Sequence, residues 1–216
     1  MIACKDADAM VTGNIRHYAA SIEKLKKVTD PRPGEEIFGM TMITLKGKTI
    51  LVADTNVQDF PSPQRLVKVS KSCVRVARLF GFDPKVAFLS HSTFGKPISK
   101  NTKHVRDAIE ILKKENVDFD FDGEMQPDVA LNPIYQEIYP FSKIVGNANI
   151  LIMPALHSAA ISTKLMKVFG GGKLIGPLLI GLGSPIEVAP LRASTSEILN
   201  LASIAAYSSD VIDYSN

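Results

Sequence analysis

The segment SHSTFGKP at residues 90–97 combines small hydroxyl side chains with a glycine and a lysine. It follows an apolar, strand-like run and precedes a stretch with helical spacing. Backbone N–H groups in such a loop, the hydroxyls of Ser90, Ser92 and Thr93, and the ammonium of Lys96 can together hold a phosphate. An ordinary strand-to-helix connection with a capping residue explains the same residues, so both interpretations stay open.

His91 lies in the same loop, and its imidazole could act as a general acid or base. No carboxylate partner for it can be identified from sequence spacing. A structural histidine with satisfied ring nitrogens is therefore the interpretation that we favour.

Acidic residues form a second group with possible chemistry. Asp118, Asp120 and Asp122 alternate with phenylalanines, which on a strand would place the three carboxylates on one face. Such a face could bind a hard cation such as Mg²⁺, or could be the solvated face of a half-exposed strand. The following loop, DGEMQPD at 122–128, is suited to ligand contact or to hydrogen bonding at a domain interface.

Other motifs narrow the function classes. FGGGK at 169–173 has the composition of a phosphate loop, but it follows a helix and precedes a strand, so we expect a helix C-cap and turn. Gly-x-Ser-x-Gly, HExxH and GxGxxG patterns are absent, which argues against hydrolase, zincin and dinucleotide-binding functions.

Four apolar runs alternate with helical stretches, and each run passes into a small-polar or acidic loop. This alternation predicts an α/β fold with a mostly parallel sheet and flanking helices, in which ligands bind at the carboxyl ends of the strands. The runs cover residues 86–96, 119–133, 150–159 and 175–186.

Two Pro/Gly-rich breaks, at 29–36 and 183–191, divide the chain. Residues 29–186 are expected to form a complete middle lobe that opens with a hairpin over 36–55 and a helix from Ser62 to about Phe80. Residues 1–28 and 187–216 are too short to bury a core alone. They contain one helix expected at 14–28 and another near Ser194, which has capping-box spacing with Glu197.

Composition sets further limits. The net charge is +3, and the 25 Lys and Arg residues are scattered, which disfavours nucleic-acid binding. No apolar run approaches the roughly 18 residues of a membrane span. Cys4 and Cys73 fit neither a metal site nor a disulfide framework, so we expect a reducing cytoplasm.

Six segments, in order, resemble the phosphotransacetylase (phosphate acetyl/butyryltransferase) family. YPFS at 139–142, LHSAAIS at 156–162 and the sequence around Pro190 resemble one branch, the phosphotransacetylase-like domain at the C-terminus of bacterial NADP-dependent malic enzymes. The six segments are KDADAMVTGNIRHY, VADTNVQDFPSPQRL, VAFLSHSTFG, DGEMQPDVALNP, GNANILIMPALHSAAISTKL and GGGKLIGPLLIGLGSPI.

The resemblance implies two α/β lobes related to isocitrate and isopropylmalate dehydrogenases, with CoA and phosphate bound in the cleft between them. Residues 1–28 and 187–216 would be remnants of a first lobe whose sheet is largely missing, as in an N-terminally truncated member. The implied ligands are acetyl-CoA or CoA and phosphate or acetyl phosphate, with no tightly bound cofactor and no metal. The implied partners are a second copy or the missing N-terminal piece, the malic enzyme catalytic part.

The resemblance also assigns residues. A Ser-Arg pair precedes the last helix of the family and falls here on Pro190 and Leu191, while an aspartate that helps to deprotonate the CoA thiol falls on Glu197. Glu197 could still act as a base, but Leu191 cannot hold a phosphate. The residues expected to contact CoA or phosphate are Thr12, Gly13, Ser92, Thr93, Gly95, Lys96, Asp122, Glu124, Gln126 and Asp128.

Three functional hypotheses follow. The chain is a regulatory domain of a malic enzyme that binds acetyl-CoA without turning it over, an active phosphate acetyltransferase that converts acetyl-CoA and phosphate to acetyl phosphate and CoA, or a non-catalytic remnant of gene decay. Loss of the Ser-Arg pair favours the first hypothesis over the second. If the ligand site is intact, Lys96→Ala should weaken CoA binding more than it lowers thermal stability.

Overall fold

A six-stranded sheet forms the centre of the larger lobe, with strand order β5-β4-β6-β3-β2-β7. The computed structural model describes residues 1–53, 60–97, 102–144, 146–212 and 214. Strands β3, β6, β4 and β5 run parallel, whereas β2 is antiparallel to both β3 and β7. The mostly parallel α/β sheet predicted from the sequence is confirmed. The strands are β2 (Phe38–Leu45), β3 (Lys48–Ala53), β4 (Lys85–Leu89), β5 (Asp120–Met125), β6 (Ile150–Ile152) and β7 (Lys173–Ile180).

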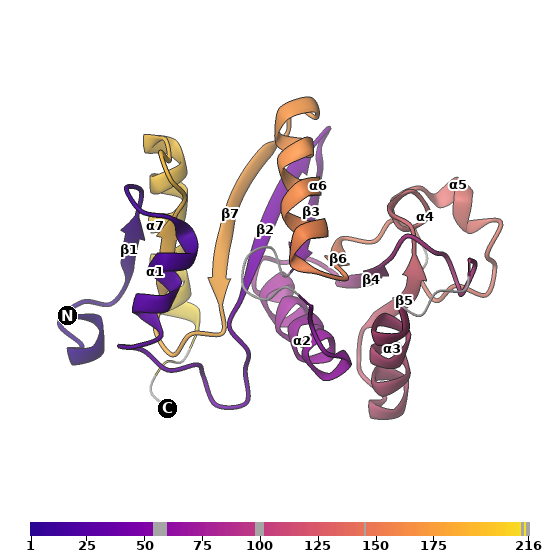
Figure 1. Cartoon of the computed structure of the whole chain (residues 1–216), viewed down its shortest axis with the longest axis horizontal. Helices are drawn as coiled ribbons and strands as arrows, with labels where there is room; N and C mark the ends of the chain where they lie inside the picture. Colours follow the sequence, from indigo (N-terminus) through magenta and orange to yellow (C-terminus); the bar gives the residue numbers. More distant parts are fainter. Residues whose placement is uncertain (54–59, 98–101, 145, 213, 215–216) are drawn as a thin grey trace.

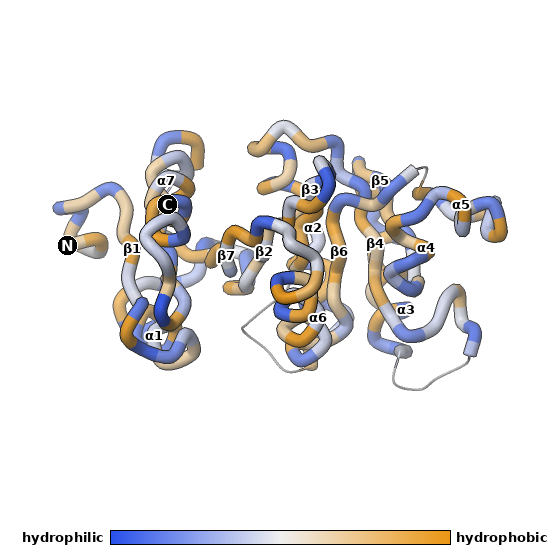
Figure 2. Tube along the Cα trace, turned by 90° about the horizontal axis from the view of Figure 1, so that it is seen from above, coloured by the Kyte–Doolittle hydropathy of each residue, from blue (hydrophilic) through white to orange (hydrophobic). Residues whose placement is uncertain are grey.

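Helices cover both faces of this sheet because its central strands are apolar on both sides. Val86 and Phe88 of β4 belong to the core under α2 and α3, while Ala87 and Leu89 belong to the core on the opposite face with α4 and α6. In Figure 2 the tube of β4 and β6 is largely orange, the colour of hydrophobic residues. The helices are α2 (Pro63–Leu79), α3 (Lys103–Glu115), α4 (Pro127–Leu131), α5 (Pro133–Gln136) and α6 (Leu156–Phe169).

The smaller lobe is built from the two ends of the chain, which lie together on one side of Figure 1. Strand β1 (Met10–Gly13) pairs in parallel with β8 (Ile186–Ala189), Gly13 opposite Ala189. Gly13 has φ +104°, and a Cβ there would lie 2.4 Å from the Ala189 carbonyl oxygen, so the pairing requires glycine. The other elements of this lobe are η1 (Ile2–Cys4), α1 (Tyr18–Leu25) and α7 (Thr195–Val211).

The helix expected over residues 14–28 is shorter than predicted and spans Tyr18–Leu25. Two positions of its expected apolar stripe, Ile15 and Val28, are 81% and 62% exposed. The chain after β1 instead keeps bonding to the segment after β8: the Asn14 N–H donates to Ala189, and the Asn14 carbonyl accepts from Arg192. These bonds hold residues 14–17 out of the helix.

Local sequence signals elsewhere agree with the structure. Ser62 caps α2 by accepting a hydrogen bond from the Arg65 N–H, with Pro63 in the first turn. Ser194 and Glu197 form the predicted capping box of α7. Residues 170–172 follow the end of α6, so the glycine run is a helix end and turn rather than a phosphate loop.

The three alternating aspartates do not share one strand face. Asp118 lies before β5 and pairs with Arg78 at 3.0 Å, and Asp122 is buried and accepts a 2.7 Å hydrogen bond from the Lys143 N–H. No group of three or more His, Cys, Asp or Glu side chains among the described residues is arranged to hold a metal ion. Asp118 and Asp122 are thus bound by other groups of the protein.

A buried carboxyl group, that of Glu187, lies where the two lobes meet. Its Oε2 accepts a 2.9 Å hydrogen bond from the Leu179 N–H of β7, and the residue is only 4% exposed. Burial raises the pKa of Glu187 to about 8. On the surface, Lys167 of α6 and Glu197 of α7 form a second link between the lobes, at 2.9 Å. We propose a middle lobe over 29–186, whose second boundary falls at the first residue of β8.

Among the residues that the structure describes, no helix is long and apolar enough to cross a bilayer.

Candidate functional site

A groove of about 980 Å³ opens at the carboxyl ends of β3, β6 and β4. Because β6 lies between β3 and β4 and the three strands are parallel, the loops that leave their carboxyl ends must meet at one edge of the sheet. This is the edge at which the strand–loop alternation predicts ligand binding.

The walls of the groove are largely apolar, with a few polar groups that face the same space. Leu89, Met153, Pro154 and Ala155 supply apolar surface. Pockets of this size and mixed lining are typical of small-molecule sites. The polar lining residues are Ser90, His91, Thr102, Lys103, His104, Asp107, His157, Ser158 and Ser162.

Two helices begin at the groove. The first turns of α3 and α6 border it, and neither Thr102 nor Ala155, the residues at their N-caps, makes a side-chain capping hydrogen bond. Both helix starts therefore direct backbone N–H groups and the positive end of the helix dipole toward this side of the sheet. Lys103 adds a cationic side chain, which pairs with Asp107 at 2.7 Å.

His104 links the two walls. Its Nε2 lies 3.0 Å from the Pro154 carbonyl oxygen, and a carbonyl can only accept, so Nε2 carries the proton. This hydrogen bond ties the start of α3 to the β6–α6 loop. His104 thus has a structural partner, whereas His91 is exposed on the rim.

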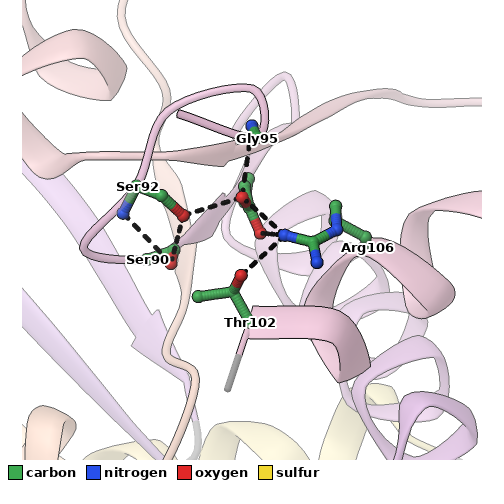
Figure 3. A network of polar contacts seen from close by, with 6 residues as sticks. Ser90, Ser92, Gly95, Thr102 and Arg106 are labelled. Carbon is green, nitrogen blue, oxygen red and sulfur yellow. Dashed lines mark hydrogen bonds and ion pairs between the residues drawn. The ribbon is translucent and has the colours of Figure 1, made fainter. Parts of the chain in front are cut away.

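The loop at 90–97 binds a carboxylate group that belongs to the protein itself. Figure 3 shows Ser90, Ser92, Gly95, Thr102 and Arg106 converging on one place. The group at this place is the carboxylate of Glu124, a residue only 1% exposed. Its Oε1 accepts from Ser92 Oγ at 2.7 Å and from the Gly95 N–H at 3.2 Å, and Arg106 Nη1 donates to both of its oxygens at 3.0 Å.

The backbone of this loop is likewise committed to protein oxygens. The N–H groups of Thr93 and Lys96 donate to each other's carbonyls, and that of Phe94 donates to the Glu124 carbonyl. The Ser92 N–H donates to Ser90 Oγ at 3.3 Å. Glu124 and the loop's own oxygens thus use these donors, and phosphate contact by the 90–97 loop stays a prediction.

The remaining predicted residues of the middle lobe surround this network. Gln126 donates from Nε2 to the His91 carbonyl at 2.7 Å, and its N–H donates to Thr93 Oγ1 at 3.2 Å. Asp128 is exposed and accepts from the Val129 N–H. Lys96 is exposed and is not part of the groove lining. Ligand contact by Lys96 and Asp128 stays a prediction.

Thr12 and Gly13 do not join this cluster within the chain. They lie on β1 of the smaller lobe, and Figure 1 shows β1 and the β4–β5 edge near opposite ends of the long axis. Neither residue lines the groove. Gly13 has a structural role in the β1–β8 pairing, and Thr12 is half-buried beside it.

Glu197 is poorly suited to act as a base. Its Oε2 accepts from the N–H and Oγ of Ser194, and its Oε1 accepts from Lys167 Nζ at 2.9 Å. These bonds, led by the Ser194 N–H, lower its pKa to about 2. A carboxylate of such low basicity takes protons weakly at neutral pH. Glu197 caps α7 in the structure, and a catalytic role for it stays a prediction.

Sequence reasoning missed Phe60, Lys103, His104 and His157 as groove residues. A usable signal existed for His157, because it follows the apolar run 150–153 at a strand's carboxyl end. Phe60 and Lys103 adjoin segments 54–59 and 98–101, which lie outside the described residues.

Comparison with known proteins shows the family to which this chain belongs. Residues 1–206 match the family described as "Phosphate acetyl/butaryl transferase". The chain is 45% identical over 207 residues to an NADP-dependent malic enzyme of Rhizobium meliloti (strain 1021), covering 96% of this chain and 27% of that protein. It is 30% identical to a phosphate acetyltransferase of Bacillus subtilis (strain 168), covering 93% of this chain and 62% of that protein.

Solved structures agree. A phosphotransacetylase from Streptococcus pyogenes is 30% identical and superposes with a TM-score of 0.90, covering 97% of this chain and 65% of that one. The EutD phosphotransacetylase from Staphylococcus aureus is 27% identical, with a TM-score of 0.84 over 96% of this chain and 65% of that one. The expected kinship with isocitrate and isopropylmalate dehydrogenases stays a prediction. The chain thus belongs to the phosphate acetyl/butyryltransferase family, and it spans about a quarter of the malic enzyme that it matches.

Proposed function

We propose that this chain binds acetyl-CoA or CoA in the groove at the carboxyl ends of β3, β6 and β4, and that it does not transfer the acetyl group to phosphate. The groove is the observation that carries the proposal. Its volume of about 980 Å³ suits a ligand of the size of CoA, and its apolar walls with a cationic residue and two helix starts suit a long ligand that bears phosphates.

The proposal that the chain does not transfer the acetyl group rests on two residue positions. Leu191, where the family resemblance expects an arginine, is an aliphatic residue and is 48% exposed. It can neither bind acetyl phosphate nor stabilise the charge that develops during transfer. Glu197, the remaining candidate base, is bound by Ser194 and Lys167 and has a pKa lowered to about 2.

The setting of the domain is proposed from its relatives. Since the R. meliloti malic enzyme contains a matching segment in 27% of its length, we propose that this chain works as the acetyl-CoA-sensing part of a malic enzyme. We expect it to work in the reducing cytoplasm, with Cys4 and Cys73 as free thiols.

We predict that the chain shows no CoA-dependent release of phosphate from acetyl phosphate. The assay compares its rate with that of an intact phosphotransacetylase and with a no-enzyme background. Turnover clearly above background would instead support the active acyltransferase hypothesis, which the 30% identity to a phosphate acetyltransferase favours.

Helix α6 carries an apolar stripe that the described residues leave uncovered. Ile161, Leu165, Val168 and Phe169 are 59%, 51%, 75% and 83% exposed, and their spacing places them on one side of the helix. Exposed apolar stripes of this kind mark interaction surfaces. We propose that a second copy covers this α6 stripe, because a two-fold axis buries a single stripe against itself.

Leu165→Glu is expected to convert a dimer to a monomer in light scattering coupled to gel filtration, because it places a charge within the buried stripe. Ile15→Glu, at a residue 81% exposed in the smaller lobe, is the matched control and should stay dimeric. A monomeric unmodified chain at micromolar concentration would overturn the association.

A further inference from the structure

Phe60 and His157 form an aromatic pair in the lining of the groove. Their ring centroids lie 5.6 Å apart, with the ring planes inclined by 57°. Phe60 is 72% exposed, so most of its ring surface contacts no part of the described protein. A phenylalanine with so little burial contributes little to the hydrophobic core. Its position in the groove lining therefore indicates a role other than core packing.

The sheet topology explains why the two rings meet. Phe60 lies in the connection from β3 to α2, and His157 lies in the first turn of α6, directly after β6. Strands β3 and β6 are parallel neighbours, with Leu51 opposite Ile150 and Ala53 opposite Ile152. The loops at their carboxyl ends are therefore side by side.

The backbone of each residue of the pair is joined to a helix. Pro61 follows Phe60 and restricts its backbone to extended conformations. Two residues later Ser62 caps α2, which is anchored in the core by buried residues including Leu66 and Val69. His157 is fixed by its place in α6. A preorganised aromatic surface loses little conformational entropy when a flat ligand stacks on it.

Other exposed aromatic rings of the middle lobe have different surroundings. Phe141 is 65% exposed but packs edge-on against Phe94 at 4.9 Å and near Tyr139, away from the groove lining. Phe169 belongs to the α6 stripe. Within the described part of the groove lining, Phe60 is the one Phe, Tyr or Trp residue, and of the three lining histidines His157 is the one that pairs with its ring.

We propose that Phe60 and His157 form the binding site for a purine ring, the adenine of a CoA-type nucleotide. This inference rests on the proposed function, because it specifies how the ligand lies in the groove. The purine stacks on the open face of Phe60 beside the imidazole of His157, and the nucleotide phosphates lie toward Lys103 and the start of α3. The acyl-pantetheine arm then runs along the apolar wall at Leu89 and Met153.

Three probes separate the parts of this ligand: acetyl-CoA, adenosine 3′,5′-diphosphate, which lacks the pantetheine arm, and acetyl-pantetheine, which lacks the nucleotide. Each is titrated calorimetrically into the full chain and into Phe60→Ala. Because Phe60 is largely exposed, its removal should leave the fold intact, which a melting curve checks.

Phe60→Ala is expected to weaken acetyl-CoA and adenosine 3′,5′-diphosphate roughly 5- to 100-fold, the range of one stacked base, and to leave acetyl-pantetheine unchanged. Phe60→Tyr should retain most of the affinity, because it keeps the ring. Phe141→Ala is the control at an exposed phenylalanine outside the groove lining and should bind all three probes as the unmodified chain does.

The outcomes distinguish the two proposals. Loss of adenosine 3′,5′-diphosphate affinity in Phe60→Ala but not in Phe141→Ala supports the purine site. Failure of the unmodified chain to bind adenosine 3′,5′-diphosphate, or equal affinity in Phe60→Ala, overturns it. Acetyl-CoA binding that Phe60→Ala leaves unaltered would keep the proposed function and reject the purine site, whereas no acetyl-CoA binding at all would reject the proposed function.

Discussion

Glu124→Ala is expected to lower the free energy of unfolding by about 3 kcal/mol, the lower end of the range for breaking a buried ion pair. The Glu124 side chain is fully buried and pairs with Arg106, whose side chain is 34% exposed. The partial exposure of Arg106 lets water replace part of the lost interaction, which keeps the cost at the lower end. The Gly95 N–H, in contrast, loses its acceptor inside the protein, and Ser92 Oγ loses its shortest hydrogen bond while Ser90 Oγ stays within 3.2 Å.

Urea unfolding followed by circular dichroism measures this effect. Glu110→Ala is the matched control, because Glu110 lies on α3, its side chain is 61% exposed, and it pairs with the nearby Lys113 on the surface. Its replacement should change stability little. If Glu124→Ala and Glu110→Ala destabilise the chain equally, Glu124 does not organise the 90–97 loop.

Glu187→Gln is expected to remove a pH dependence of stability from the unmodified chain. Burial raises the pKa of Glu187 from 4.5 to about 8 in the folded state, so between these pH values the folded state keeps a proton that the unfolded chain releases. Stability is therefore highest at or below pH 4.5, as far as this group is concerned, and falls as pH rises toward 8. The slope is at most about 1.4 kcal/mol per pH unit within that window.

Glutamine keeps an acceptor for the Leu179 N–H but does not ionise. Unfolding free energies measured between pH 5 and 8.5 should consequently fall more steeply for the unmodified chain than for Glu187→Gln. Glu197→Gln is the control: the pKa of Glu197 is lowered to about 2, so its contribution is lost only as pH falls below 4.5. Parallel curves for all three proteins would contradict a protonated Glu187 in the joint between the lobes.

The sheet could be predicted from sequence because its strands are short, apolar and separated by turn residues. Strand β4 shows this well: Val86 to Leu89 are all buried, as an inner strand covered on both faces requires. The Ser194–Glu197 capping box was also predictable, because it depends on two residues three positions apart.

The site was less predictable because its residues are brought together over long sequence separations. The composition of 90–97 predicts either a phosphate loop or an ordinary strand-to-helix connection, and only the folded chain shows that its donors bind the carboxylate of Glu124. In the same way, Phe60 and His157 are separated by almost a hundred residues and meet through the parallel pairing of β3 and β6. The predicted 14–28 helix starts later than expected because Asn14 bonds to Ala189 and Arg192, which lie even farther along the chain.

Calorimetric titration of acetyl-CoA into the full chain tests directly whether the chain binds this ligand without turning it over. We predict saturable binding at one site per chain, without any change in the acetyl-CoA when phosphate is present. If the chain binds no acetyl-CoA at millimolar concentration, the proposed acetyl-CoA site is wrong. The chain would then be a folded remnant without this ligand. Conversion of acetyl-CoA and phosphate to acetyl phosphate would contradict the proposed absence of acetyl transfer, because the chain would then transfer the acetyl group without an arginine at position 191.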